Sequence, residues 1–322
     1  MSRERILPLL IHLLIFGVGV AFLFGGADWL VRGSSNLARY FRVHPLVVGL
    51  TVVAFGTSAP ELVVSLVAAL RGNPDIALGN VVGSNIANAG LVLGLAAVVR
   101  PLAVGRKTLL QEVPIMVAAQ LAFLLLAWYG SDVSRVDGLI LLAGMVAFSS
   151  LMLHRTIDDR ASSLLRGPCD KGSPWKCLFK NTFFVGTGII GLVFGSNLMI
   201  DSGEALARAA GVSEWVIGAT LIAVGTSLPE LATSLVAAYR RETDICIGNV
   251  VGSNIFNVLL ILGTVATVRP LAVPESVLHF ELPAMFLLCL LLWPIMVTGR
   301  RVSRLEGILL LFLYSLFISR LV

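Results

Sequence analysis

The chain has 322 residues, of which 57% are apolar and only 13% charged, and its mean hydropathy is +0.91. This composition excludes a soluble globular domain and indicates a polytopic membrane protein. The net charge of +5 does not indicate a nucleic-acid partner, because the basic residues lie in short segments between apolar runs, where they act as topology signals.

Apolar runs of about 20 residues predict an all-α protein with ten transmembrane helices in two sets of five. The runs lie near 7–32, 45–70, 75–98, 108–128, 136–153, 178–203, 214–238, 244–267, 277–298 and 305–321. The first run is too long for the core of a signal peptide, so we expect it to remain as a span. The longest polar interval separates the two sets. We therefore expect a first repeat at 1–153, a linker at 154–177 and a second repeat at 178–322.

The distribution of Lys and Arg predicts the orientation of these spans. Of the 24 basic residues, 17 fall in alternate loops on one side and 7 on the other. By the positive-inside rule the richer side is cytoplasmic, which makes the linker cytoplasmic and both termini extracytoplasmic in a cell membrane. An odd number of spans per set then predicts that the second repeat is inverted, an architecture that places substrate near the membrane midplane.

Two motifs occur twice, 169 residues apart. GTSAPEL at 56–62 recurs as GTSLPEL at 225–231, and GNVVGSNIAN at 79–88 recurs as GNVVGSNIFN at 248–257. Over the 49 residues from position 56, 33 are identical in the second copy. Shared membrane composition cannot explain this identity, so we interpret the two halves as copies of one unit.

Each copy places a glutamate, Glu61 or Glu230, directly after a proline inside an apolar run. A carboxylate at that depth costs about 2.5 kcal/mol or more, which makes it a candidate functional residue. Pro60 and Pro229 each lack an N–H and should break the helix where the acid lies. A protonated acid hydrogen-bonded to a neighbouring helix is the structural alternative, but two acids in matching contexts argue against it.

Polar residues at spacings of three and four lie on one helical face with each glutamate or on a second helix opposite it. They are Thr57, Ser58, Thr226 and Ser227 beside the glutamates, and Ser84, Asn88, Ser253 and Asn257 on the second helices. The set offers oxygen ligands without His or Cys, which suits hard cations such as Ca²⁺ rather than zinc or copper. Two carboxylates balance one Ca²⁺ or two Na⁺.

Other features have structural interpretations. Interhelical hydrogen bonding alone would explain Asn88 and Asn257, although their pairing with the glutamates favours a ligand role. We interpret the four cysteines as reduced thiols. Glycines and polar residues in the first helix of each set mark these two helices as candidate moving elements.

At GTSAPEL, GTSLPEL and the two GNVVGSN strings, the sequence resembles the sodium/calcium exchanger family of the cation/calcium antiporter superfamily, in its prokaryotic form with a short linker. The resemblance implies Ca²⁺/Na⁺ antiport by alternating access, with Ca²⁺, Na⁺ and the lipid bilayer as partners, and without cofactor or protein partner. It implies that Glu61 and Glu230 bind Ca²⁺ and share Na⁺ sites. It adds the carbonyls of Ala54 and Ala223 to the ligands. Potassium-dependent relatives carry aspartate where this chain has Asn257, which argues against K⁺ cotransport.

Three alternative functions remain open from the residues. A Ca²⁺/H⁺ antiporter is the nearest, because a glutamate can exchange a proton for a cation. A membrane hydrolase with Ser58 or Ser227 as nucleophile lacks a histidine or lysine base in either copy, so we do not expect an enzyme. A channel would differ in the rate of ion movement.

Overall fold

The computed structural model describes residues 3–130, 132–162, 174–211 and 223–321, and helices make up nearly all of them. The helices of the first half are α1 (Arg3–Phe41), α2 (Pro45–Val48), α3 (Ala54–Thr57), α4 (Ala59–Leu70), α5 (Pro74–Ala87), α6 (Leu93–Val99), α7 (Val113–Gly130) and α8 (Arg135–Ser162). Those of the second half are α9 (Pro174–Ala209), α11 (Ala223–Thr226), α12 (Leu228–Tyr239), α13 (Thr243–Phe256), α14 (Gly263–Val268), α15 (Leu282–Val297) and α16 (Arg304–Leu321).

Short π-helical segments join several of these helices into longer spans. They are η1 (Gly49–Val53), η2 (Asn88–Val92), η3 (Thr108–Glu112), η5 (Asn257–Leu262) and η6 (Val277–Glu281), and a 3₁₀ turn, η7 (Thr298–Arg300), follows α15. The two π segments η2 and η5 begin at Asn88 and Asn257. Segments η3 and η6 form a second matching pair, which begins at Thr108 and Val277, so the π-helical distortions recur at corresponding places in the two halves.

Seven helices in the described part of the chain are long and apolar enough to cross a bilayer, and the bent pair 45–57 and 59–70 makes an eighth candidate. This agrees with a multi-pass membrane protein. The predicted span at 214–238 falls partly on residues outside the description. Helix α16 carries Arg304, Glu306 and Arg320 near its ends, so its apolar part is short.

The predicted linker is partly helical. Helix α8 continues to Ser162 and α9 begins at Pro174, so both extend into 154–177, and the residues between them lie outside the described ranges. Cys177 is disulfide-bonded. The expectation of reduced thiols is therefore wrong for this residue. Cys246 and Cys289 are free and buried.

The expected helix breaks are present in both halves. Between α3 and α4 the axis bends by 44° at Ser58, whose φ and ψ are −85° and 4°. Ser227 has nearly the same angles, −88° and 5°, between α11 and α12. Each break precedes a proline that cannot donate to the helix and whose ring would clash with the carbonyl four residues earlier. The breaks place two new helix N-termini inside the protein.

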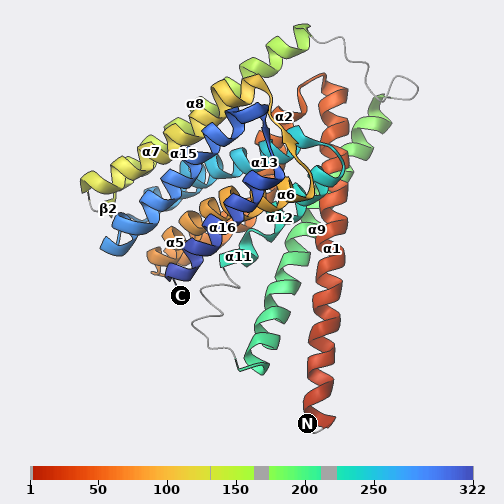
Figure 1. Ribbon diagram of the computed structural model, residues 1–322, viewed down its shortest axis with the longest axis vertical. Coiled ribbons are helices and arrows are strands. Elements are labelled where there is room, and N and C mark those ends of the chain that lie inside the picture. The colour runs from red at the N-terminus through yellow and green to blue at the C-terminus, as the bar shows by residue number, and fades with distance from the viewer. Residues whose placement is uncertain (1–2, 131, 163–173, 212–222, 322) are drawn as a thin grey trace.

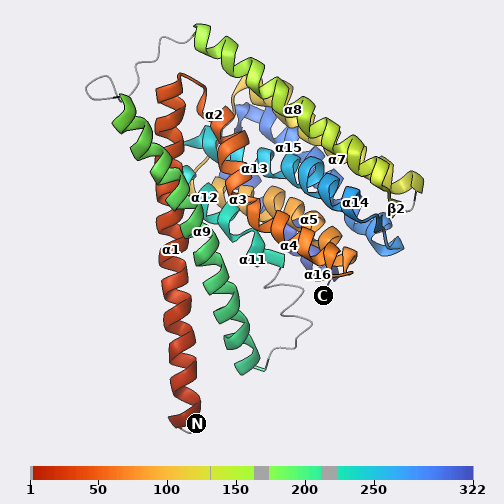
Figure 2. The same cartoon turned by 180° about the vertical axis from the view of Figure 1, so that it is seen from behind.

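Helices α5 and α13, with the segments that follow them, form the centre of the molecule. In the span 243–268, 94% of the most apolar stretch is buried, against 17% in the span 9–41 that belongs to α1. Helix α1 runs beside α9 along one side of the molecule, while α7, α8 and α15 lie on the opposite side (Figures 1 and 2). A Cβ on Gly26 of α1 would lie 2.7 Å from the carbonyl oxygen of Gly188 in α9, so the two backbones can approach this closely only through glycine.

Two-residue strands connect the halves at the ends of the helices. Strand β1 (Leu102–Ala103) pairs antiparallel with β4 (Arg301–Val302), and β2 (Asp132–Val133) pairs antiparallel with β3 (Leu271–Ala272). In each pair one strand follows the third long span of its half and the other follows the fourth. Each strand pair therefore joins a loop of the first half to a loop of the second half.

Candidate functional site

The two motif glutamates lie at corresponding positions in the centre of the molecule. Glu61 is in the first turn of α4 and Glu230 in the first turn of α12, and both side chains are fully buried. The positive end of a helix dipole favours a carboxylate in the first turn, by about 0.3–1 kcal/mol at an exposed site. Burial of an ionised carboxylate costs several kcal/mol, so the helix ends cannot stabilise these two charges by themselves.

The two carboxyl groups belong to one site. They are close enough to interact electrostatically. Ser58, which precedes α4 in the first half, donates a hydrogen bond of 2.8 Å to Oε1 of Glu230 in the second half. Ser253 of α13 donates to the same oxygen at 3.4 Å. Polar side chains of both halves therefore meet at the Glu230 carboxylate.

Three carboxylate oxygens of the pair accept no hydrogen bond from the described residues although they are buried: Oε1 and Oε2 of Glu61, and Oε2 of Glu230. The side-chain oxygens of Ser84, Asn88, Ser227 and Asn257 are buried in the same unsatisfied state. Buried polar atoms in proteins nearly always have a partner. Carboxylate, amide and hydroxyl oxygens without a protein donor are the atoms that a hard cation takes as ligands.

The two halves of the site differ in their hydrogen bonding. Glu230 accepts two serine hydroxyls, whereas Glu61 accepts neither of the corresponding ones, those of Ser227 and Ser84. Likewise the Nδ2 of Asn257 donates to Oδ1 of Asn85 at 3.3 Å, while Nδ2 of Asn88 has no acceptor in the described structure. The described residues therefore supply donors to one carboxylate oxygen of Glu230 and to neither oxygen of Glu61.

A further pair of asparagines, absent from the sequence-based candidates, connects the halves. Nδ2 of Asn249 donates to the carbonyl oxygen of Glu230 at 3.2 Å and to the Ser234 hydroxyl at 3.0 Å. Its Oδ1 accepts from Oγ1 of Thr57 at 3.0 Å. The amide thus ties α13 to its own motif helix and to the motif of the other half.

Asn80 makes the corresponding contacts in the first half. Its Nδ2 donates to the carbonyl oxygen of Glu61 at 3.4 Å and to the Ser65 hydroxyl at 2.9 Å, and its Oδ1 accepts from Oγ1 of Thr226 at 3.1 Å. We call this pair of amides, Asn80 and Asn249, the asparagine clasp. Its residues could have been found in the sequence, because each asparagine lies in a repeated string, GNVVGSN, at the same offset as the glutamates.

The other two predicted ligands are the backbone carbonyls of Ala54 and Ala223. The carbonyl oxygen of Ala54 accepts from the Ser58 amide at 2.9 Å and from Oγ1 of Thr57 at 3.2 Å, so both of its lone pairs have donors. Ala223 begins helix α11, and its side chain lies outside the description. Of the twelve predicted residues, five make side-chain hydrogen bonds across the two halves: Thr57, Ser58, Thr226, Glu230 and Asn257. Ser253 bonds to Glu230 within the second half.

Comparison with known proteins agrees with this geometry. The model of the family described as sodium/calcium exchanger protein matches residues 11–153 and 180–322. The chain belongs to the sodium/calcium exchanger family. The two matched segments cover both halves and leave out the interval between α8 and α9 together with the adjoining ends of both helices.

Individual relatives match over nearly their full length. The chain is 36% identical over 303 residues to the protein named "Putative antiporter CaxA" of Alkalimonas amylolytica, covering 91% of this chain and 93% of that one. It is 31% identical to the sodium/calcium exchanger MaX1 of Methanosarcina acetivorans, covering 96% and 97%. The fold is similar to that of the sodium-calcium exchanger NCX_Mj soaked with 10 mM Na⁺ and no Ca²⁺, with a TM-score of 0.84, 32% identity and coverage of 98% and 100%.

Proposed function

We propose that this chain is a secondary active antiporter that exchanges Ca²⁺ for Na⁺ across the membrane by alternating access. One observation carries the proposal: Glu61 and Glu230, from opposite halves, are buried side by side with three carboxylate oxygens that accept no hydrogen bond from the described residues. Two uncompensated charges in a membrane interior are very costly, and bound cations neutralise them. Membership of the exchanger family supports the choice of ions.

The proposed cation ligands are the twelve residues selected from the sequence. They are Glu61, Glu230, Asn88, Asn257, Thr57, Thr226, Ser58, Ser227, Ser84, Ser253, and the carbonyls of Ala54 and Ala223. Glu61 and the unsatisfied oxygens of Ser84, Asn88 and Ser227 have the strongest support. For Ala54 the support is weakest, because a cation would have to replace one of two hydrogen bonds that its carbonyl already accepts.

The charge of the site explains why the transport is an exchange. The two carboxylates carry −2 when ionised, which one Ca²⁺ or two Na⁺ neutralise. A loaded site is close to neutral and can pass between the two membrane-facing states, whereas an unloaded site would carry two buried charges through the same change. Since the penalty for an uncompensated buried charge is several kcal/mol, return without a cation is suppressed and the two ions are coupled.

We further propose that the ten predicted helices form two five-helix repeats of inverted topology, with repeats at 1–153 and 178–322 and a linker at 154–177. The strand pairing supports this. Strand β1 follows the third span of the first half and β4 follows the fourth span of the second. In repeats of the same orientation these loops would emerge on opposite membrane faces. Inverted repeats bring them to the same face, where they can pair.

The positive-inside rule gives the proposed orientation: the basic loops and the linker are cytoplasmic and both termini are extracytoplasmic in the cell membrane. The pairs β1–β4 and β2–β3 then lie on the cytoplasmic and extracytoplasmic faces respectively. A membrane-impermeant thiol reagent applied to intact cells expressing Ser2→Cys would test the N-terminus. Labelling only after permeabilisation would refute this orientation.

Flux in proteoliposomes tests the exchange itself. Calcium-45 uptake is measured with an outward gradient of Na⁺, of K⁺ or of protons, each applied alone at the same external Ca²⁺. The proposal predicts uptake driven by the Na⁺ gradient and abolished by a Na⁺ ionophore. Uptake driven by the proton gradient and unaffected by removing Na⁺ would overturn the sodium assignment.

A further inference from the structure

A polar pocket of about 270 Å³ lies between the ends of α1, α9 and α12, at the opposite end of α12 from Glu230. Four cationic side chains line it: Arg32, Arg39, Lys180 and Arg240. Two carboxylates, Asp28 and Glu242, pair with them. Four cations against two carboxylates leave the pocket with a net charge of +2.

The carboxylates are already shared among several donors. Asp28 forms ion pairs with both Arg32, at 2.9 Å, and Arg240. Glu242 accepts the Ser35 hydroxyl at 2.6 Å and lies 4.0 Å from Arg39. The pocket therefore has more positive charge and more N–H donors than its own acids can satisfy, which suits an anion that brings several acceptor oxygens.

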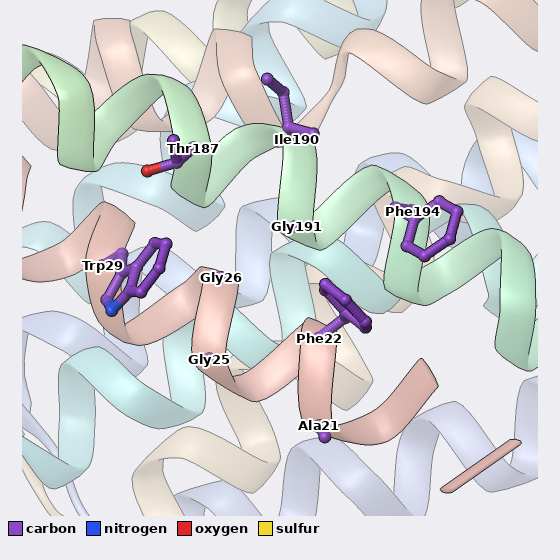
Figure 3. A pocket seen from close by; sticks show the side chains of 9 residues that line it. All are labelled: Ala21, Phe22, Gly25, Gly26, Trp29, Thr187, Ile190, Gly191 and Phe194. Carbon is purple, nitrogen blue, oxygen red and sulfur yellow. The ribbon is translucent and has the colours of Figure 1, made fainter. Parts of the chain in front are cut away.

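An apolar groove of about 500 Å³ lies on the same pair of helices (Figure 3). Its floor contains Gly25 and Gly26 of α1 and Gly191 of α9. Phe22 and Phe194 form an edge-to-face pair at one end, with ring centroids 5.2 Å apart. The groove opens outward, since Phe22 and Phe194 remain 47% and 49% exposed on helices that are long and apolar enough to span the membrane.

The groove and the pocket adjoin each other along α1 and α9. Trp29 lines the groove, and its ring stacks on that of Phe184 at 5.9 Å. Phe184 in turn lines the polar pocket, where Nζ of Lys180 lies 5.6 Å from its centroid. An apolar groove along the membrane-facing side thus lies next to a cationic pocket at the helix ends, with the stacked pair Trp29 and Phe184 between them.

We propose that this pocket and groove bind one anionic phospholipid, with the phosphate in the cationic pocket and one acyl chain along the groove between α1 and α9. The groove alone cannot select a ligand, because lipid tails are as apolar as the side chains that line it. The selectivity comes from the net positive charge of the pocket. Its four cations fall in the loops predicted to be cytoplasmic, and basic pockets between helices on that side bind anionic headgroups.

Native mass spectrometry of the full chain in a non-ionic detergent tests the binding. The protein is equilibrated with phosphatidylglycerol or phosphatidylcholine of the same chain length, and bound lipid is counted. We expect the wild type to prefer phosphatidylglycerol at least about fivefold, and Arg32→Gln with Lys180→Gln to lower its affinity about tenfold, since charge-assisted hydrogen bonds are lost. The control is Arg106→Gln with Arg304→Gln, which removes two exposed cations elsewhere and should change the affinity less than twofold.

A second pair of variants tests the groove. A Cβ on Gly25 meets no atom within 4 Å, so Gly25→Leu adds a side chain to the groove without disturbing the contact between α1 and α9. Gly17 is equally open on the same helix but does not line the groove, which makes Gly17→Leu the control. We expect Gly25→Leu to reduce bound phosphatidylglycerol at least about threefold and Gly17→Leu to leave it unchanged.

Several results would overturn the proposal. Equal binding of the two lipids, or equal loss in the pocket variant and its control, would exclude a specific anion site. Glycerol 3-phosphate displacing the lipid at equal concentration would assign the site to a free phosphate compound, and unchanged binding in Gly25→Leu would exclude the groove. Each variant must elute as wild type in size exclusion. If the double variant does not, Lys180→Gln alone replaces it, with Arg106→Gln as its control, and an unchanged affinity would again refute the site.

Discussion

Replacing one amide of the asparagine clasp should destabilise the folded protein. Asn249→Ala removes three hydrogen bonds, those to the Glu230 carbonyl, the Ser234 hydroxyl and Thr57, at 3.2, 3.0 and 3.0 Å. All of these groups are buried. A buried hydrogen bond contributes about 1 kcal/mol net, so the loss is about 3 kcal/mol, or about 150-fold in the unfolding equilibrium.

The assay is equilibrium unfolding of the purified protein in mixed micelles of increasing sodium dodecyl sulfate content, followed by tryptophan fluorescence, without Na⁺ and with a chelator so that cation binding does not contribute. Asn197→Ala is the matched control, since Asn197 is exposed on α9. Asn80→Ala should have a smaller effect, because its hydrogen bonds are only partly buried. Asn249→Ala within about 0.5 kcal/mol of Asn197→Ala would refute the clasp, since that is the range of neutral surface substitutions.

Three other predictions concern the site and the helix pair beside it. Glu61→Gln and Glu230→Gln should each abolish Na⁺-driven calcium-45 uptake, because one negative charge of the site is lost without a change in side-chain shape. The yield and the size-exclusion profile of both variants should stay normal. Uptake at the wild-type rate in either variant would exclude that residue from the site. Gly26→Ala should lower the free energy of unfolding by about 1–3 kcal/mol, as overpacking does, because its Cβ would lie 2.7 Å from a backbone oxygen of α9. Gly25→Ala should leave this free energy unchanged, because a Cβ there meets no atom within 4 Å. Equal effects of the two substitutions would contradict the close helix contact. Because Asn257 provides no carboxylate, uptake should be the same with K⁺ or choline as the counter-cation, and a K⁺ requirement would show that a third ion is transported.

The sequence predicts the chemistry of the site better than its hydrogen bonding. Glu61 and Glu230 could be selected because a repeated carboxylate in an apolar run is costly and therefore unexpected, and the helix breaks follow from the prolines beside them. Which oxygens are satisfied by protein donors depends on how the two halves meet. The unequal surroundings of the two glutamates were therefore beyond sequence reasoning, since the motifs around them are nearly identical.

The asparagine clasp was missed for a different reason. Asn80 and Asn249 lie in the repeated strings, but the selection of candidates followed the spacing of Ser84 with Asn88 and of Ser253 with Asn257 on one helical face. The clasp residues lie four positions before the serines, near enough to the same face to have been considered. Their partners, Ser65 and Ser234, are also repeated at the same offset, so the full repeat contained the signal.

The positions of the long helices were predicted to within a few residues at most ends, because hydropathy alone fixes them. The ends of α1, α8 and α9 were less well placed, since they were predicted near 32, 153 and 203 and lie at Phe41, Ser162 and Ala209. Charged residues in 155–160 were interpreted as a loop, whereas a helix can continue beyond the membrane once its polar side chains reach water. The π-helical segments that start at Asn88 and Asn257 have no recognisable signal in the sequence.

The most direct test of the central claim is a crystal structure of the protein soaked with Sr²⁺ as an anomalous substitute for Ca²⁺. The account predicts one divalent-cation peak between α4 and α12, with carboxylate oxygens of both Glu61 and Glu230 within about 2.3–2.6 Å, or slightly farther for the larger ion. A peak coordinated by only one of the two glutamates, or bound elsewhere in the membrane-spanning region, would contradict it.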